Sequence, residues 1–75
     1  MMYWIITKPN CPHCDRAKAV LDKNGEAYQA FSYDTHPMLT KLMFKAGLKT
    51  VPQIWHNTEY IGGADDLETY LTDRG

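Results

Sequence analysis

The chain has 75 residues, of which 44% are hydrophobic and 23% charged, and its formal net charge is −1. This length predicts one domain over residues 1–75 with a small core, and it excludes a second domain. The composition is that of a soluble globular chain, and the balanced charge excludes a broad nucleic-acid-binding surface.

The first predicted element is a strand at residues 3–7, nearly all apolar and rich in aromatic and β-branched side chains. Such a run is typical of a central strand covered on both faces. The apolar segment, residues 2–6, has neither the length nor the basic leader of a signal peptide or membrane span. We therefore expect a cytoplasmic protein.

A turn at residues 8–10 leads to a predicted helix that starts at Pro12, because apolar side chains recur there at helical spacing. Asn24 and Gly25 favour its end. Residues 28–33 predict a second strand, and a strand, helix and strand in succession imply a right-handed parallel crossover. A second amphipathic helix is expected from Pro37 to Gly47.

The remaining apolar segments predict two strands, residues 51–55 and 59–61, joined by a hairpin turn at residues 56–58. A short final helix follows the two glycines at 62–63. The predicted order is βαβαββα, which is an α/β chain. We expect Met38 and Met43 to fill the core, and His36 and His56 to be surface loop residues.

The only two cysteines form the segment Cys11-Pro12-His13-Cys14 at the start of the first predicted helix. Residues i and i+3 share one side of a helix, so a disulfide between the two sulfurs can open and close. The helix N-terminus favours a negative charge, which would lower the pKa of Cys11. We expect Cys11 to be exposed and Cys14 to lie on the buried stripe behind it. Because so short a loop removes little chain entropy, the pair predicts redox chemistry.

His13 has two possible interpretations. An imidazolium beside Cys11 would stabilise the thiolate and make the protein more oxidising. Alternatively, His13 is an exposed side chain with no part in catalysis.

Three separated motifs resemble those of the glutaredoxins, small members of the thioredoxin superfamily. They are Cys11 to Cys14, Thr50-Val51-Pro52, and residues 61–67 with the sequence IGGADDL. The resemblance implies a thioredoxin-like fold with a four-stranded mixed sheet flanked by three helices. It also implies a monomeric, glutathione-dependent oxidoreductase that reduces protein disulfides or glutathione mixed disulfides.

In that family the first cysteine, here Cys11, attacks and the second, here Cys14, resolves. The bond before the proline matching Pro52 is cis in the family, which turns the backbone of Val51 toward the cysteines. There it can pair, strand-like, with the peptide backbone of glutathione or a substrate.

Glutathione carries two carboxylates and one ammonium group, and the resemblance implies a partner for each. Lys8 would attract the glycyl carboxylate, the N–H groups of Ala64 and Asp65 would hold the γ-glutamyl carboxylate, and Asp66 would accept from the ammonium. The expected glutathione site comprises Lys8, His13, Thr50, Val51, Pro52, Gly63, Ala64, Asp65 and Asp66.

The sequence departs from the family at two positions. His13 replaces the usual tyrosine, which bears on both glutathione affinity and redox potential. Ala64 replaces a larger residue or a cysteine, which leaves the predicted site more open on one side.

Two alternatives remain. A thioredoxin-like redoxin would donate electrons to ribonucleotide reductase and be recharged by thioredoxin reductase, but Lys8, Thr50 and Asp66 argue against it. A metal or iron–sulfur protein would use the two cysteines and a histidine. No second Cys-x-x-Cys completes such a site, and His13 points to another side of the helix, so no metal is expected.

Overall fold

The computed structural model describes residues 2–74 and confirms the predicted order of elements. They are β1 (Tyr3–Thr7), α1 (Pro12–Lys23), β2 (Tyr28–Ser32), α2 (Pro37–Lys45), β3 (Gln53–His56), β4 (Glu59–Gly62) and α3 (Ala64–Arg74). The first six differ from their predicted ranges by two residues or fewer at either end, whereas the last helix, predicted to be short, has 11 residues. Within the described range, no helix is long and apolar enough to cross a membrane.

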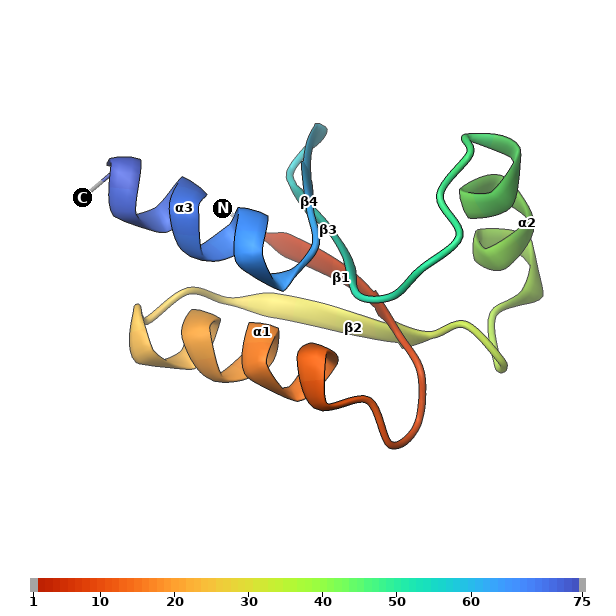
Figure 1. Cartoon of the computed structure of the whole chain (residues 1–75), viewed down its shortest axis with the longest axis horizontal. Helices are drawn as coiled ribbons and strands as arrows, with labels where there is room; N and C mark the ends of the chain where they lie inside the picture. Colours follow the sequence, from red (N-terminus) through yellow and green to blue (C-terminus); the bar gives the residue numbers. More distant parts are fainter. Residues whose placement is uncertain (1, 75) are drawn as a thin grey trace.

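The four strands form one mixed sheet in the order β2-β1-β3-β4. β1 pairs parallel with β2, as the predicted crossover requires, and antiparallel with β3, which in turn pairs antiparallel with β4. Helices α1 and α3 pack against each other, whereas α2 stands apart from both, beyond the far end of the sheet (Figure 1). This is the thioredoxin-like arrangement that the motifs predicted.

The core lies between the sheet and the pair α1 and α3. Burial of each large aliphatic side chain contributes about 1.5–3 kcal/mol to folding. Helical spacing in α1 and the alternation along β1 aim these side chains at one another. The buried cluster consists of Tyr3, Ile5, Ala17, Leu21, Ile54, Ala64 and Leu67.

The opposite face of the sheet is only partly covered. Trp4 in the central strand β1 remains 38% exposed, so the prediction that this strand is covered on both faces was wrong for that position. Met43 on α2 is buried, as predicted, but Met38 is 72% exposed and its predicted core position was wrong. The two methionines are five residues apart on one helix and project about 140° apart, so α2 buries only one of them.

His56 was wrongly predicted to be a loop residue. It ends β3, is only 5% exposed, and stacks on the ring of Tyr3 with centroids 4.2 Å apart. Its Nδ1 is 2.7 Å from the hydroxyl oxygen of Tyr70 on α3. Because side chains alternate along a strand, His56 faces the same side as Ile54 and is covered by α3. His36, at the start of α2, is exposed as predicted.

Candidate active site

The sheet register brings the separated motifs to one end of the molecule. Ile6 of β1 pairs with Gln53 of β3, so the chain that leaves β1 runs beside the chain that enters β3. Lys8 and Val51 accordingly line one cavity of about 260 Å³. Residues 61–67, which form the third motif, also lie at this end. A Cβ atom placed on Gly63 would be 3.7 Å from the carbonyl oxygen of Pro52.

Cys11 and Cys14 form a disulfide at the start of α1, with their Cα atoms 5.2 Å apart. Cys11 is the N-cap residue in an extended conformation, with φ −114° and ψ 102°. The backbone N–H of Cys14 donates to Cys11 Sγ at 3.1 Å. The sulfur of Cys11 therefore occupies the position of an ordinary capping oxygen, facing an N–H group that the helix leaves unpaired.

The two cysteines differ in burial less than expected. Cys14 is 1% exposed and Cys11 is 4% exposed, so the predicted exposure of Cys11 is wrong in this disulfide form. Its sulfur is bonded to that of a buried residue, which draws the side chain against the first turn of α1. The predicted order, with Cys14 the more buried, is nonetheless confirmed.

Pro12 and His13 are both exposed on the first turn of α1. Pro12 occupies the first helical position, where its missing N–H costs no hydrogen bond. Across residues 2–74, His13 makes no hydrogen bond or ion pair, so the geometry leaves both interpretations of this side chain open.

The Val51–Pro52 peptide bond is cis, as the resemblance implied. Pro52 is buried and comes directly before β3. This position satisfies the requirement that a proline lie at a strand end, because it donates no ladder hydrogen bond.

Gln53 was not predicted as a site residue. Its side chain is buried, and its Nε2 donates to the carbonyl oxygen of Thr50 at 2.8 Å and to the Thr50 hydroxyl oxygen at 3.3 Å. The hydroxyl of Tyr60 in turn donates to Gln53 Oε1. An amide directly after Pro52 and before the apolar pair Ile54 and Trp55 was the sequence signal available.

Tyr60 connects this network electrostatically to the last helix. Tyr60 is 46% exposed; its partial burial, and secondarily the charge of Asp66, raise the pKa of Tyr60 above its ordinary value of 10.0. The proton that the Tyr60 hydroxyl donates to Gln53 is therefore held more tightly than that of a free tyrosine.

The N-terminus of α3 is held by its own acidic residue. Asp66 Oδ2 accepts a hydrogen bond from the N–H of Gly63 at 3.2 Å, and the carbonyl oxygen of Gly63 accepts from Leu67 at 3.0 Å. The N–H groups of Ala64 and Asp65 thus stand at a helix start where no intrahelical acceptor exists. The Asp66 carboxylate therefore caps α3 and lies at the same helix end as the N–H groups of Ala64 and Asp65.

Gly62 is required by this cap. Its φ of 126° is one that side-chain-bearing residues rarely adopt, and an added carbon would collide with the Asp66 carboxylate. The carboxylate of Asp65 is paired with Arg16 of α1, which also reaches Glu68 at 3.3 Å. These pairs are exposed and contribute at most about 1 kcal/mol each, but they join α1 to the start of α3.

Lys49 is a second residue that the sequence reasoning missed. It lines the same cavity as Lys8, together with Thr50 and Val51. Two ammonium groups at one cavity suit an anionic ligand. The available signal was a lysine directly before the Thr50 motif.

No group of three or more His, Cys, Asp or Glu side chains within residues 2–74 is arranged to hold a metal ion.

The sequence matches the glutaredoxin family profile over residues 4–61. It is 44% identical over 64 residues to glutaredoxin 3 of Escherichia coli K12, a match that covers 84% of this chain and 77% of that protein. The solution structure of glutaredoxin from Brucella melitensis superposes with a TM-score of 0.79 at 36% identity, covering 100% of this chain and 82% of that one.

A buckwheat glutaredoxin–glutathione complex is also similar, with a TM-score of 0.81 at 26% identity over 96% of this chain and 69% of that chain. The NrdH-redoxin of Escherichia coli has a TM-score of 0.81 at 18% identity, covering 92% of this chain and 93% of that one. At 18% identity, the similarity to the NrdH-redoxin shows only that the two proteins share a fold.

Proposed function

Because this chain belongs to the glutaredoxin family and is a thiol–disulfide oxidoreductase, we propose that it draws its electrons from glutathione. Its substrates are protein disulfides or mixed disulfides between glutathione and a thiol. The observation that carries this proposal is the position of Cys11 Sγ at the start of α1, facing the N–H of Cys14 at 3.1 Å. In the reduced protein this N–H and the helix dipole stabilise the Cys11 thiolate, which is the attacking form.

Reduction of a protein disulfide begins when the Cys11 thiolate attacks one substrate sulfur. A bond forms between Cys11 and that sulfur, the substrate disulfide breaks, and the leaving thiolate takes up a proton. Cys14, as a thiolate, then attacks the sulfur of Cys11. This step releases the second substrate thiol and forms the Cys11–Cys14 disulfide, the state of the structure.

Two glutathione molecules then restore the dithiol. The first attacks Cys11 as a thiolate, forms a mixed disulfide with it and frees Cys14. The second attacks the glutathione sulfur of that mixed disulfide, which returns Cys11 as a thiolate and produces glutathione disulfide. The two electrons given to the substrate thus come from two glutathione thiols.

For a glutathione mixed disulfide, Cys14 is not needed. Cys11 attacks the glutathione sulfur directly and releases the substrate thiol. A second glutathione then frees Cys11.

We propose that glutathione lies across the end of the sheet where the three motifs meet. Lys8 and Lys49 attract its glycyl carboxylate, and the backbone of Val51 pairs with its peptide groups. The amides of Ala64 and Asp65 hold the γ-glutamyl carboxylate.

The remaining glutathione contacts involve the ammonium group and the site walls. Asp66 accepts from the ammonium through the carboxylate that also caps α3. Thr50, Pro52 and Gly63 shape the backbone around the ligand, and His13 lies at its edge. The buckwheat glutaredoxin–glutathione complex supports this placement by its similarity. We propose a monomer that works in a reducing cytoplasm.

The test is turnover of a small glutathione mixed disulfide with glutathione, NADPH and glutathione reductase, set beside the same protein with thioredoxin reductase. We expect turnover with glutathione that Cys11→Ser abolishes. Turnover by thioredoxin reductase alone would replace the proposal with the alternative electron donor to ribonucleotide reductase.

A further inference from the structure

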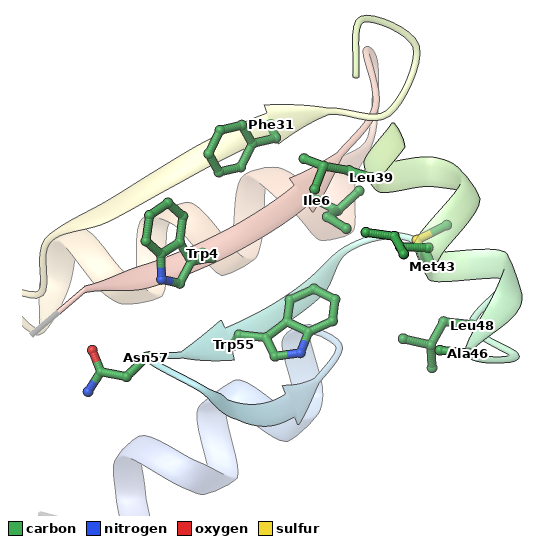
Figure 2. Close-up of a pocket in the computed structure, with 10 residues that line it drawn as sticks. Trp4, Ile6, Phe31, Leu39, Met43, Ala46, Leu48, Trp55 and Asn57 are labelled. Carbon is green, nitrogen blue, oxygen red and sulfur yellow. The ribbon is translucent and has the colours of Figure 1, made fainter. Parts of the chain in front are cut away.

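An apolar groove of about 400 Å³ separates α2 from the open face of the sheet. The aromatic side chains of Trp4, Phe31 and Trp55 line it from the sheet, and Leu39 and Met43 line it from α2 (Figure 2). Its walls are almost wholly apolar. Such a groove suits large apolar side chains, and it does not suit glutathione, whose charges need polar partners.

The groove adjoins the proposed glutathione site at one residue. Met43 lines both the groove and the cavity that contains Lys8 and Val51. Phe44, the next residue, lines that cavity and is 51% exposed. The groove and the cavity are therefore neighbours on either side of Met43.

The solvent side of α2, which turns away from the groove, carries basic as well as apolar side chains. Residues 35–58 contain Lys41, Lys45 and Lys49 and no aspartate or glutamate. Within the described range, none of these lysines is ion-paired. The acidic side chains of the chain lie on the other elements instead. Met38 and Leu42 on α2 are also exposed, at 72% and 60%.

We propose that α2 and the groove, here called the α2 surface, form the docking site for a protein substrate. The partner is an extended segment that carries a large apolar side chain and acidic residues close to its disulfide. The apolar side chain enters the groove, and the carboxylates face Lys41 and Lys45. This inference rests on the proposed function, because it names the class of protein that the same cysteines reduce.

The groove provides its own spectroscopic probe, because both tryptophans of the chain line it. The probe is a redox-inert peptide in which serine replaces the reactive cysteine, with leucine and glutamate residues on either side of that serine. The protein is titrated with this peptide, and tryptophan emission is measured. We expect a saturable change. The change should weaken when glutamine replaces the glutamates, and it should disappear when serine replaces the leucine. Binding without any change in emission would overturn the proposal.

A kinetic experiment separates the α2 surface from the chemistry. We expect the double variant Lys41→Glu/Lys45→Glu to lower kcat/KM for the glutathionylated acidic peptide about tenfold, and high salt to abolish the difference. Turnover of a small glutathione mixed disulfide should be unchanged. Lys23→Glu, a charge reversal on α1, is the matched control and should alter neither substrate. Equal losses of kcat/KM on both substrates would overturn the proposal that the α2 surface binds the protein substrate.

The two proposals fail in distinguishable ways. If the unaltered protein does not turn over the small mixed disulfide, the proposed function fails while the fluorescence titration still tests docking. If tryptophan emission instead changes with protein concentration alone, and sedimentation shows dimers, the occupant is a second copy and the proposed partner is wrong.

Discussion

The side chain of Gln53 fastens the loop before β3 by donating to both the carbonyl and the hydroxyl oxygen of Thr50, at 2.8 and 3.3 Å. Val51, whose backbone we propose to pair with glutathione, lies between these two residues. The loop is therefore held in place before any ligand arrives, and preorganisation of this kind reduces the ordering that binding must impose.

Replacing Gln53 should thus weaken substrate binding more than the chemical step. We expect Gln53→Leu to raise KM for a glutathione mixed disulfide by about tenfold with a smaller change in kcat, since it loses both hydrogen bonds to Thr50, of about 1 kcal/mol each, as well as the one from Tyr60. Tyr60→Phe removes only the hydrogen bond to Gln53 Oε1 and should raise KM less. An unchanged KM in Gln53→Leu would show that the loop keeps its position without the amide.

Cys14→Ser should separate the two classes of substrate. Because glutathione can free Cys11 without Cys14, we expect this variant to keep turning over a glutathione mixed disulfide and to lose reduction of a protein disulfide such as that of insulin. The glutathione-coupled assay measures the first activity, and precipitation of the reduced insulin chains measures the second. Loss of both activities would mean that Cys14 also supports the first attack, for example by keeping its N–H aimed at Cys11 Sγ.

His13→Tyr tests the interaction of the imidazole with the thiolate. If the imidazolium stabilises Cys11 in its reduced form, its loss should lower the redox potential by on the order of 30 mV, equivalent to tenfold in equilibrium constant. Equilibration of the Cys11/Cys14 pair with glutathione buffers measures the change, with Lys18→Ala on the same helix as the control. An unchanged potential would leave His13 as an exposed side chain without a role in the redox reaction.

His56 should contribute to stability and not to catalysis. Its ring is buried between Tyr3 and Tyr70, so we expect His56→Ala to lower the free energy of unfolding by about 3 kcal/mol through the cavity it creates. His36→Ala, at an exposed position, should change it by about 0.5 kcal/mol or less. Urea unfolding measures both. Equal effects of the two substitutions would contradict the buried position of His56.

Tyr60 should make stability depend on alkaline pH. Burial and the charge of Asp66 raise its pKa in the folded protein, so above pH 10 the unfolded chain loses this proton before the folded protein does. The folded state then binds more protons, and the free energy of unfolding falls as pH rises through the raised pKa. We expect a shallower fall in Tyr60→Phe, measured by urea unfolding between neutral and alkaline pH. Identical pH profiles would contradict the shift.

The order and type of the elements, and the redox chemistry, were predictable from the amino-acid sequence. Apolar periodicity in each segment distinguishes helix from strand, because it depends only on local geometry. Helix-start chemistry likewise located Cys11 and Pro12, since a cap needs only the neighbouring backbone. The family motifs were recognisable because they are short and contiguous.

Which surfaces are covered and which motifs meet depends on contacts between elements that are far apart in the sequence. Alternation along β3 set His56 on one face of the sheet, but only the packing of α3 made that face buried. Trp4 remained exposed because α2 stands away from the sheet, which no local pattern encodes. The meeting of Lys8 and Lys49 at one cavity likewise depends on strand register, which brings together residues that are distant in sequence.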